Sequence, residues 1–211
     1  MKQLKIQSYL LIIIIIFIFS GCAENVRFRS FTDPSLQASS VNTVAILPIR
    51  NARILPGESR EMSRAFAREF VSKNKSIKII NAVESTDIIN DNNMADKYAD
   101  FLRDYSVSGI PNAKVLREIG AILKADAILQ GEIIDLVQQD GHYPGVMART
   151  SLTLRYSLIS TSRGDVLWEA TCSANLKPGG ISSVYTPPPP IIDVIQLAQE
   201  RVLKDIPYLG K

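Results

Sequence analysis

The sequence predicts an α/β (α+β) sandwich, in which a mixed sheet combines an N-terminal βαβ unit with a C-terminal three-stranded antiparallel meander and is flanked by helices. Three observations support this prediction. Residues 127–176 contain three consecutive segments that suit strands, two of them with alternating apolar and polar side chains. Residues 41–80 place two short apolar runs on either side of an amphipathic helical pattern. Further helical patterns occur between residues 84 and 124 and at residues 191–206.

The middle strand of the meander shows the clearest alternation. Its apolar-face positions are Ala148, Thr150, Leu152, Leu154, Tyr156 and Leu158, and its polar-face positions are Arg149, Ser151, Thr153, Arg155 and Ser157. The third strand repeats the pattern with Val166, Trp168, Ala170, Cys172, Ala174 and Leu176 on the apolar face. A turn that contains Gly164 joins these two strands, so we expect an antiparallel hairpin. The alternation predicts a sheet with one dry face and one wet face.

The βαβ unit begins with residues 41–49, where the run Val44-Ala45-Ile46-Leu47 is typical of a strand buried on both faces. A helix is expected from about residue 59 to residue 73, because Met62, Phe66 and Phe70 recur every four residues. Residues 77–80 supply a second short strand. A strand, a helix and a strand in this order predict a parallel pair.

The remaining segments are mostly helical in pattern. Five aspartates are spread over residues 84–108, but they lack the spacing, the loop glycine and the closing glutamate of a calcium-binding EF-hand, so a solvated helical face is expected. Asn112 is the predicted N-cap of a helix that runs to Lys124. Residues 181–190 are expected to form a loop that ends in four prolines in the polyproline II conformation, either a stiff spacer or a recognition segment, and the helix that follows favours the spacer. The apolar stripe of the last helix is predicted to be Ile192, Ile195, Ala198, Val202 and Ile206.

The first 21 residues predict a lipoprotein signal peptide. Lys2 and Lys5 precede the apolar run at residues 10–19, which is shorter than the ~20 residues of a membrane-spanning helix. The following Ser20-Gly21-Cys22 resembles the bacterial lipoprotein signal, in which the cysteine is diacylated and becomes the mature N-terminus. Phe19 stands where that signal usually has an aliphatic residue. An ordinary secretory peptide and an uncleaved anchor are the alternatives.

Residues 22–40 are polar and aperiodic, and we expect a lipidated N-terminus with a flexible tether, followed by a single domain over residues 41–211. By resemblance to lipoprotein sorting in Gram-negative bacteria, Ala23 lacks the aspartate of inner-membrane retention. This favours lipid anchoring in the outer membrane with the domain facing the periplasm. Loss of the signal peptide also lowers the net charge from +3 to about +1, because two lysines are removed. No basic cluster then remains to indicate a nucleic-acid partner.

Few residues suggest catalysis. The single histidine, His142, lies in an expected turn, and Cys172 lies on the apolar face of its strand, where a buried thiol is expected. A zinc site would need more His or Cys ligands, and no glycine-rich phosphate loop follows the first strand. We therefore expect that the protein is not an enzyme and has no cofactor or metal, and the sequence identifies no small-molecule substrate. A glycosidase-type pair of carboxylates remains open, because its two acids can be far apart in the sequence.

Three motifs resemble a known group of proteins. They are Val44-Ala45-Ile46-Leu47-Pro48, the segment from Leu116 to Ile119 with Ala125-Asp126-Ala127-Ile128-Leu129-Gln130-Gly131-Glu132-Ile133, and the segment from Leu154 to Trp168. In order and spacing they resemble the "VAVLPF", "LGADxxxxGxI" and "LxLxDxxTGxxxW" motifs of CsgG-like and LpoB-like periplasmic lipoproteins and of a related family of uncharacterised outer-membrane lipoproteins. Two positions depart from the pattern: Ser160 replaces a frequent aspartate, and Arg163 interrupts the usual Thr-Gly turn.

The resemblance implies a fold like the N-terminal domain of TolB, used for protein–protein contacts in the cell envelope. It favours a lipid-anchored periplasmic interaction module, an accessory component of an outer-membrane transport or envelope-biogenesis assembly. One alternative is a CsgG-type export channel made of identical subunits, although the turn at residues 140–146 is too short to hold a membrane-inserting hairpin. Another is an LpoB-like activator of peptidoglycan synthesis. The expected partners are the membrane, reached through the lipid on Cys22, and other envelope proteins or further copies of the chain.

Overall fold

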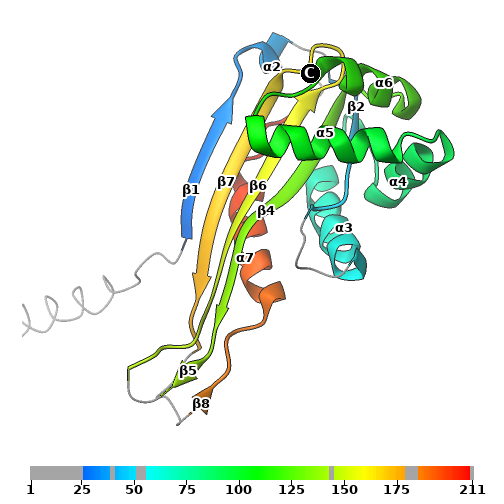
Figure 1. The fold of residues 1–211 in the computed structure, drawn as a ribbon. Coiled ribbons are helices and arrows are strands. Elements are labelled where there is room, and N and C mark those ends of the chain that lie inside the picture. Colours follow the sequence, from blue (N-terminus) through cyan, green and yellow to red (C-terminus); the bar gives the residue numbers. More distant parts are fainter. Residues whose placement is uncertain (1–25, 39–40, 51–55, 143–144, 179–184, 210–211) are drawn as a thin grey trace, which may run out of the picture.

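The computed structural model describes residues 26–38, 41–50, 56–142, 145–178 and 185–209, and its centre is a six-stranded mixed sheet with helices on both faces (Figure 1). Across the sheet the strands are β1 (Val26–Thr32), β7 (Val166–Leu176), β6 (Arg149–Ser160), β4 (Ala127–Gln139), β2 (Thr43–Ile46) and β3 (Lys78–Ile80). Neighbours from β1 to β4 are antiparallel, whereas β4, β2 and β3 are parallel. The predicted meander and βαβ unit are both confirmed.

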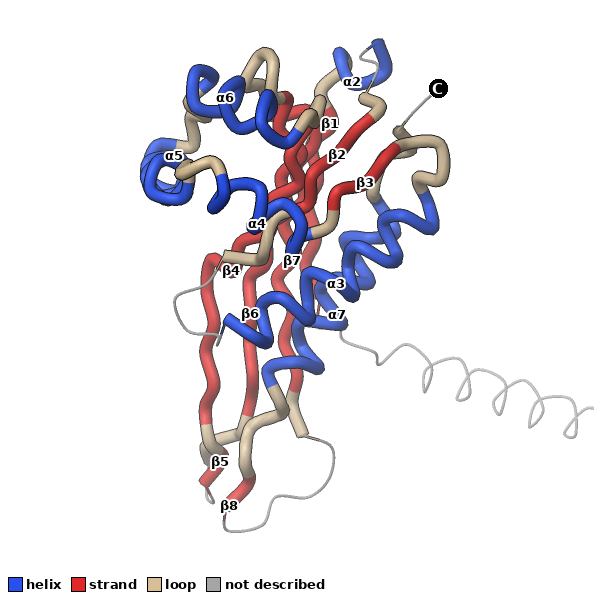
Figure 2. Tube along the Cα trace, turned by 90° about the vertical axis from the view of Figure 1, so that its right-hand side faces the viewer, coloured by secondary structure: helices blue, strands red, loops and turns tan. Residues whose placement is uncertain are grey.

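Two layers of helices bury the two faces of the sheet (Figure 2). One face is covered by α3 (Pro56–Lys73) and α7 (Ile191–Asp205), whose Phe66, Phe70 and Val202 join the principal core. The other face is covered by α4 (Ala82–Asp91), α5 (Ala95–Ser108) and α6 (Ala113–Leu123), which enclose a second core. The short α2 (Ser35–Ala38) follows β1. The described residues include no helix both long enough and apolar enough to cross a membrane.

Several local predictions are confirmed. The side chain of Asn112 accepts hydrogen bonds from the backbone N–H groups of Lys114 and Val115, and so caps α6 as expected. The helical pattern at residues 84–108 corresponds to α4 and α5. Pro190 has φ −57° and ψ 142°, which is polyproline II geometry, and it immediately precedes α7.

The expectation of a flexible tether is wrong for residues 26–38. Val26–Thr32 is the edge strand β1, and it pairs along its length with β7, from Val26 opposite Ala174 to Thr32 opposite Trp168. Most of its side chains are exposed, so it carries no strong alternation in the sequence. The backbone of β7 supplies the hydrogen bonds that hold it, and the Arg201 guanidinium lies 3.6 Å from the Phe28 ring centre. Residues 1–25, including Cys22, lie outside the described part of the chain.

The prediction of one dry and one wet face is correct for only half of the sheet. At the end covered by α4, α5 and α6, both faces are buried, and Ile128 and Ile159 pack into the second core. A β-bulge opposite Leu158 and Ile159 also turns Val166 toward this second core, away from the face that holds Trp168. Farther along β4, β6 and β7, no described helix covers the second face (Figure 1).

The stripe predicted for the last helix is right except at one position. Ile195, Ala198, Val202 and Ile206 are buried, but Ile192 is 45% exposed. Val194 is buried in its place. The first turn of α7 lies where the strands project beyond the main body (Figure 2), and there Ile191 packs against the principal core while Ile192 faces away from it. At the end of this projection, β5 (Gly141–His142) pairs with β8 (Tyr185–Thr186), where a turn and a loop had been expected.

Candidate interaction site

The residues that first suggested chemistry lie in different parts of the molecule. Cys172 is fully buried in the principal core, and burial raises the pKa of its thiol to about 11. His142 is exposed on the small β5–β8 sheet, where its ring centre lies 5.7 Å from that of Tyr185. Within the described residues, no three His, Cys, Asp or Glu side chains are grouped so that they could hold a metal ion.

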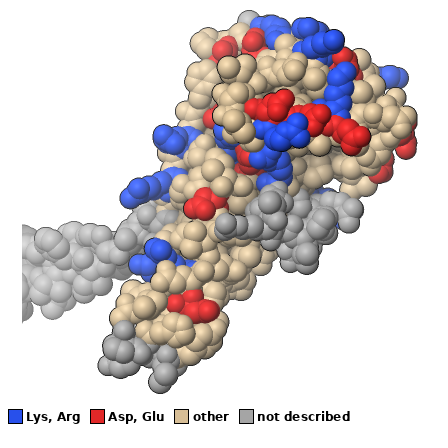
Figure 3. All heavy atoms as spheres, in the orientation of Figure 1, with Lys and Arg blue, Asp and Glu red and all other residues tan. Residues whose placement is uncertain are grey.

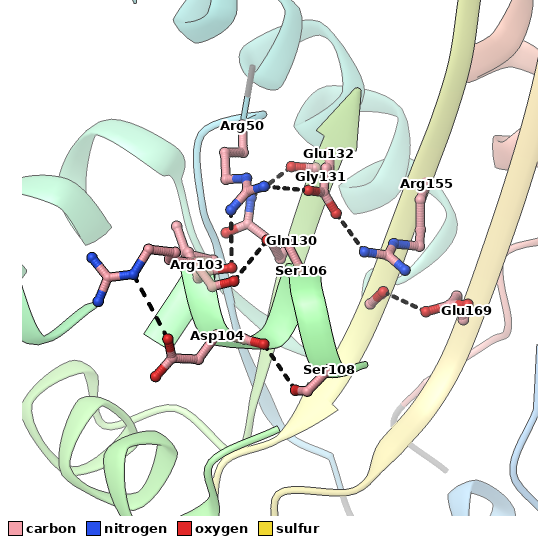
Figure 4. Close-up of polar contacts among 12 residues, drawn as sticks. Arg50, Arg103, Asp104, Ser106, Ser108, Gln130, Gly131, Glu132, Arg155 and Glu169 are labelled. Carbon is pink, nitrogen blue, oxygen red and sulfur yellow. Dashed lines mark hydrogen bonds and ion pairs between the residues drawn. The ribbon is translucent and has the colours of Figure 1, made fainter. Parts of the chain in front are cut away.

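A network of charged side chains lies where α5 crosses the sheet (Figure 4). Glu132 on β4 receives Arg50 Nη2 at 2.6 Å on one carboxylate oxygen and Arg155 Nη2 at 2.5 Å on the other. Arg50 Nη1 also donates to the carbonyl oxygen of Leu102 on α5 at 2.9 Å. Arg155 lies 5.6 Å from the ring centre of Tyr105, also on α5. The set therefore ties α5 to β4 and β6.

Neighbouring polar groups complete this network. The Tyr98 hydroxyl donates to Gln130 Oε1, and Gln130 Nε2 donates to the carbonyl oxygen of Pro48 at 2.9 Å. Ser157 Oγ donates to Glu169 Oε2 at 3.0 Å. Burial raises the pKa of the Tyr98 hydroxyl, so it stays protonated as a donor.

This charged network does not have the properties of a ligand site. Burial lowers the pKa of the Arg155 guanidinium, but the hydrogen bond and the charge of Glu132 outweigh burial and raise it overall. Two arginines face Glu132 and the nearby Glu169, so the charges balance without a bound ion. The space between the side chains is about 10 Å³, which is too small for an organic ligand. Its role is to hold α5 against the sheet.

A much larger groove lies at the β3 edge of the sheet, between α3 and α4. It has a volume of about 870 Å³ and an apolar lining that includes Ala67, Val71, Ile79, Val83 and Ile88. Val71 is 41% exposed there. A groove of this volume is within the range of small-molecule and peptide sites.

The walls of this groove carry opposite charges. Arg64 and Arg68 line it from α3, whereas Glu84, Asp87 and Asp91 line it from α4. None of these five side chains forms an ion pair with another described residue. The two walls therefore favour an occupant with acidic groups on one side and basic groups on the other.

The base of the groove is the end of the sheet. Ile79 belongs to β3, which is last in the strand order and pairs with β2 along one edge only, within the described part of the chain. An edge strand presents backbone N–H and C=O groups to any chain that approaches it. The groove therefore combines apolar surface, charged walls and an open strand edge.

Sequence patterns gave no sign of this groove. The helix stripe correctly placed Met62, Phe66 and Phe70 inward, and it left Arg64 and Arg68 as solvent-facing residues. The acidic wall belongs to another helix, whose aspartates were predicted from the sequence to form a solvated face. Only the packing of α3 and α4 on opposite faces of the sheet, beside the same edge strand, brings the two walls together (Figure 2).

Comparison with known proteins yields structural neighbours only. No protein-family model matches the sequence, and no curated protein matches it either. Among solved structures, the chain is similar to the PelC dodecamer from Paraburkholderia phytofirmans, with 17% identity and a TM-score of 0.47 over 85% of this chain and 93% of that one. It is also similar to lipoprotein GNA1162 from Neisseria meningitidis, with 14% identity and a TM-score of 0.49 over 78% of this chain and 96% of that one.

The LpoB C-terminal domain from Salmonella enterica is similar as well, with 8% identity and a TM-score of 0.38 over 66% of this chain and 85% of that one. The similar structures thus include one LpoB domain, the kind of protein that the sequence motifs resemble. At these identities and TM-scores, none of the three likenesses shows a function.

Proposed function

We propose that the protein is a lipid-anchored, non-catalytic interaction module of the bacterial cell envelope, and that the groove between α3 and α4 holds a segment of a partner envelope protein. The observation that carries this proposal is the position of the groove along the open edge of β3. A partner segment in extended conformation adds its backbone hydrogen bonds to that edge and places alternate side chains on the apolar lining.

The charges define the partner further. Acidic side chains of the segment lie toward Arg64 and Arg68, and basic side chains lie toward Glu84, Asp87 and Asp91. This polarity fixes the orientation of the bound segment and disfavours segments with the reverse arrangement. The partner is thus a strand-forming segment with an apolar face and opposite charges on its two sides.

Lipidation of Cys22 would hold this module at the outer membrane, facing the periplasm. The support is the signal motif Ser20-Gly21-Cys22 that follows an apolar run. Replacement of Cys22 by serine is expected to release the protein into the soluble periplasmic fraction of fractionated cells. If the Cys22→Ser protein remains in the membrane fraction, the prediction that Cys22 carries a lipid anchor is wrong.

The groove is tested with a photo-crosslinking amino acid in living cells, placed at Val71 in one strain and at Val107 in another. Both positions are exposed valines, and Val107 lies on α5, away from the groove. We expect crosslinks to another envelope protein from position 71, their loss when Arg68→Glu is added, and no such crosslink from position 107.

The other outcomes are equally informative. Crosslinks from position 71 to a second copy of the chain would favour an assembly of identical subunits, as in the export-channel alternative. Equal crosslinking from positions 71 and 107, or none from position 71, would contradict the groove as the binding surface.

A further inference from the structure

The uncovered face of the sheet carries a second hollow, unrelated to the groove. One row of side chains crosses four strands there: Asp135 on β4 lies opposite Thr153 on β6, Thr153 opposite Ser173 on β7, and Ser173 opposite Arg27 on β1. Ser151 and Asn175 form the next row. These side chains line a hollow of about 330 Å³, together with Lys177 at its rim.

The lining of this hollow is rich in hydroxyl and amide groups. Thr153 Oγ1 and Ser173 Oγ lie 3.0 Å apart and share a hydrogen bond. Asn175 Oδ1 is shielded from solvent, yet no group in the described part of the chain donates to it. A shielded acceptor without a donor is unfavourable, and a hydroxyl group that reached it would supply the missing hydrogen bond.

The charges of the hollow are also unpaired. Arg27 and Lys177 are exposed, and neither forms an ion pair with another described residue. Asp135 stands at the β4 end of the row. Figure 3 shows Lys and Arg side chains along the β1 side of the projecting half of the molecule. Two cations at one end of a hydroxyl-rich hollow suit a phosphate, and the lone carboxylate at the other end suits a hydroxyl donor.

The chain length places this hollow near a membrane, if Cys22 is lipidated as proposed above. β1 begins at Val26, four residues after Cys22. Four residues span at most about 14 Å. Because Arg27 is the second residue of β1, the hollow that it lines cannot lie far from the headgroups. The hollow is held close to the membrane because residues 26–32 form strand β1 and not a long tether.

We infer that the hollow binds the phosphoglycerol headgroup of an anionic phospholipid in the membrane that anchors the protein. The phosphate lies between Arg27 and Lys177, and the glycerol hydroxyls donate to Asp135 and, once the Asn175 side chain turns toward the hollow, to its Oδ1. This contact turns the uncovered face of the sheet toward the membrane and leaves the groove at β3, at the opposite edge of the sheet from β1, available to a partner.

The test uses the purified mature chain with Cys22→Ser, so that binding does not depend on acyl chains. Flotation is measured with vesicles of phosphatidylcholine alone, with added phosphatidylglycerol, and with added phosphatidylserine at the same charge density. We expect the tightest binding to phosphatidylglycerol, and competition by soluble glycerol phosphate. The double variant Arg27→Gln/Lys177→Gln is expected to lose roughly tenfold or more in affinity. The matched variant Lys97→Gln/Arg103→Gln, on α5, is expected to bind as the parent does.

Asn175→Leu separates headgroup recognition from general attraction to negative charge. It removes the acceptor and keeps the net charge, so it should abolish the preference for phosphatidylglycerol over phosphatidylserine. Equal binding to both anionic vesicles by the parent chain, or no effect of the Arg27 and Lys177 changes, would overturn the inference. The vesicle experiment contains no partner protein, so its failure would not contradict the proposal that the groove binds a partner. Failure of the crosslinking test would likewise not contradict lipid binding in this hollow.

Discussion

The side-chain amide of Gln199 on α7 donates a hydrogen bond of 2.8 Å to the hydroxyl of Tyr156 on β6, inside the principal core. The Tyr156 ring also stacks on Phe66 of α3, with ring centres 3.9 Å apart. One tyrosine thus joins the sheet to both helices that cover this face. Burial raises the pKa of its hydroxyl, which therefore stays neutral.

Tyr156→Phe is expected to destabilise the protein by about 1–3 kcal/mol, because the buried Gln199 amide loses its acceptor. Gln199→Leu alone should cost a similar amount, since it leaves the tyrosine hydroxyl unpaired. The double variant should cost clearly less than the sum of the two. Urea denaturation of the four proteins measures this coupling, and strict additivity would show that the hydrogen bond contributes nothing specific.

Gly120→Ala is expected to destabilise the protein although alanine favours helices. A Cβ atom at position 120 of α6 would lie 2.4 Å from Cβ of Thr161, which is too close for two carbon atoms. The resulting strain of about 1–3 kcal/mol exceeds the helix preference of about 1 kcal/mol. The neighbouring exposed Ala121→Gly should lose about 1 kcal/mol by helix propensity alone. Thermal unfolding that finds Gly120→Ala more stable than the parent would contradict this packing argument.

Glu132→Gln is expected to loosen α5 from the sheet, because it takes the shared charge from Arg50 and Arg155. The expected loss of stability is roughly 1–3 kcal/mol. This is less than for a fully buried ion pair, because both arginines are partly exposed. Hydrogen exchange should quicken in α5 before it does in α3. Glu118→Gln removes the exposed ion pair with Lys97 and serves as the control, with no measurable change expected. Equal effects of the two substitutions would refute the structural role of Glu132.

Burial of Cys172 is expected to make the free energy of unfolding depend on pH in the alkaline range. Its pKa is raised from 9.0 to about 11, so the unfolded chain loses the thiol proton more readily than the folded protein does. The stability from this group is present below about pH 9 and is lost as the pH rises toward about 11. In a Cys22→Ser background, the difference in free energy of unfolding between Cys172 and Cys172→Ala protein should narrow by up to about 2 kcal/mol over that range. A constant difference, or rapid thiol labelling of the native protein at neutral pH, would show that Cys172 is not buried in solution.

Much of the fold could be predicted because the decisive signals are local. The alternation on β6 and β7 identified a hairpin with Leu154 and Cys172 inside, and the spacing of Phe66 and Phe70 identified the buried stripe of α3. Strand β1 was missed because an edge strand has little buried surface, and its stability comes from backbone pairing with a partner about 140 residues away. Neither the groove nor the hollow could be predicted: the hollow is lined by strands far apart in the sequence, and the groove exists only because α3 and α4 pack beside the same edge strand.

The amino-acid sequence was sufficient to predict the class of the fold, the direction of the main strands, the buried state of Cys172 and the helix cap at Asn112. Each of these depends on side-chain periodicity or on chemistry within a few residues. The three-dimensional arrangement was needed to show that residues 26–32 pair with β7, that Glu132 binds Arg50 and Arg155, and where the groove and the hollow lie. These features arise where separate elements meet at an edge or on an uncovered face of the sheet, and periodicity within one segment carries no information about what packs beside it.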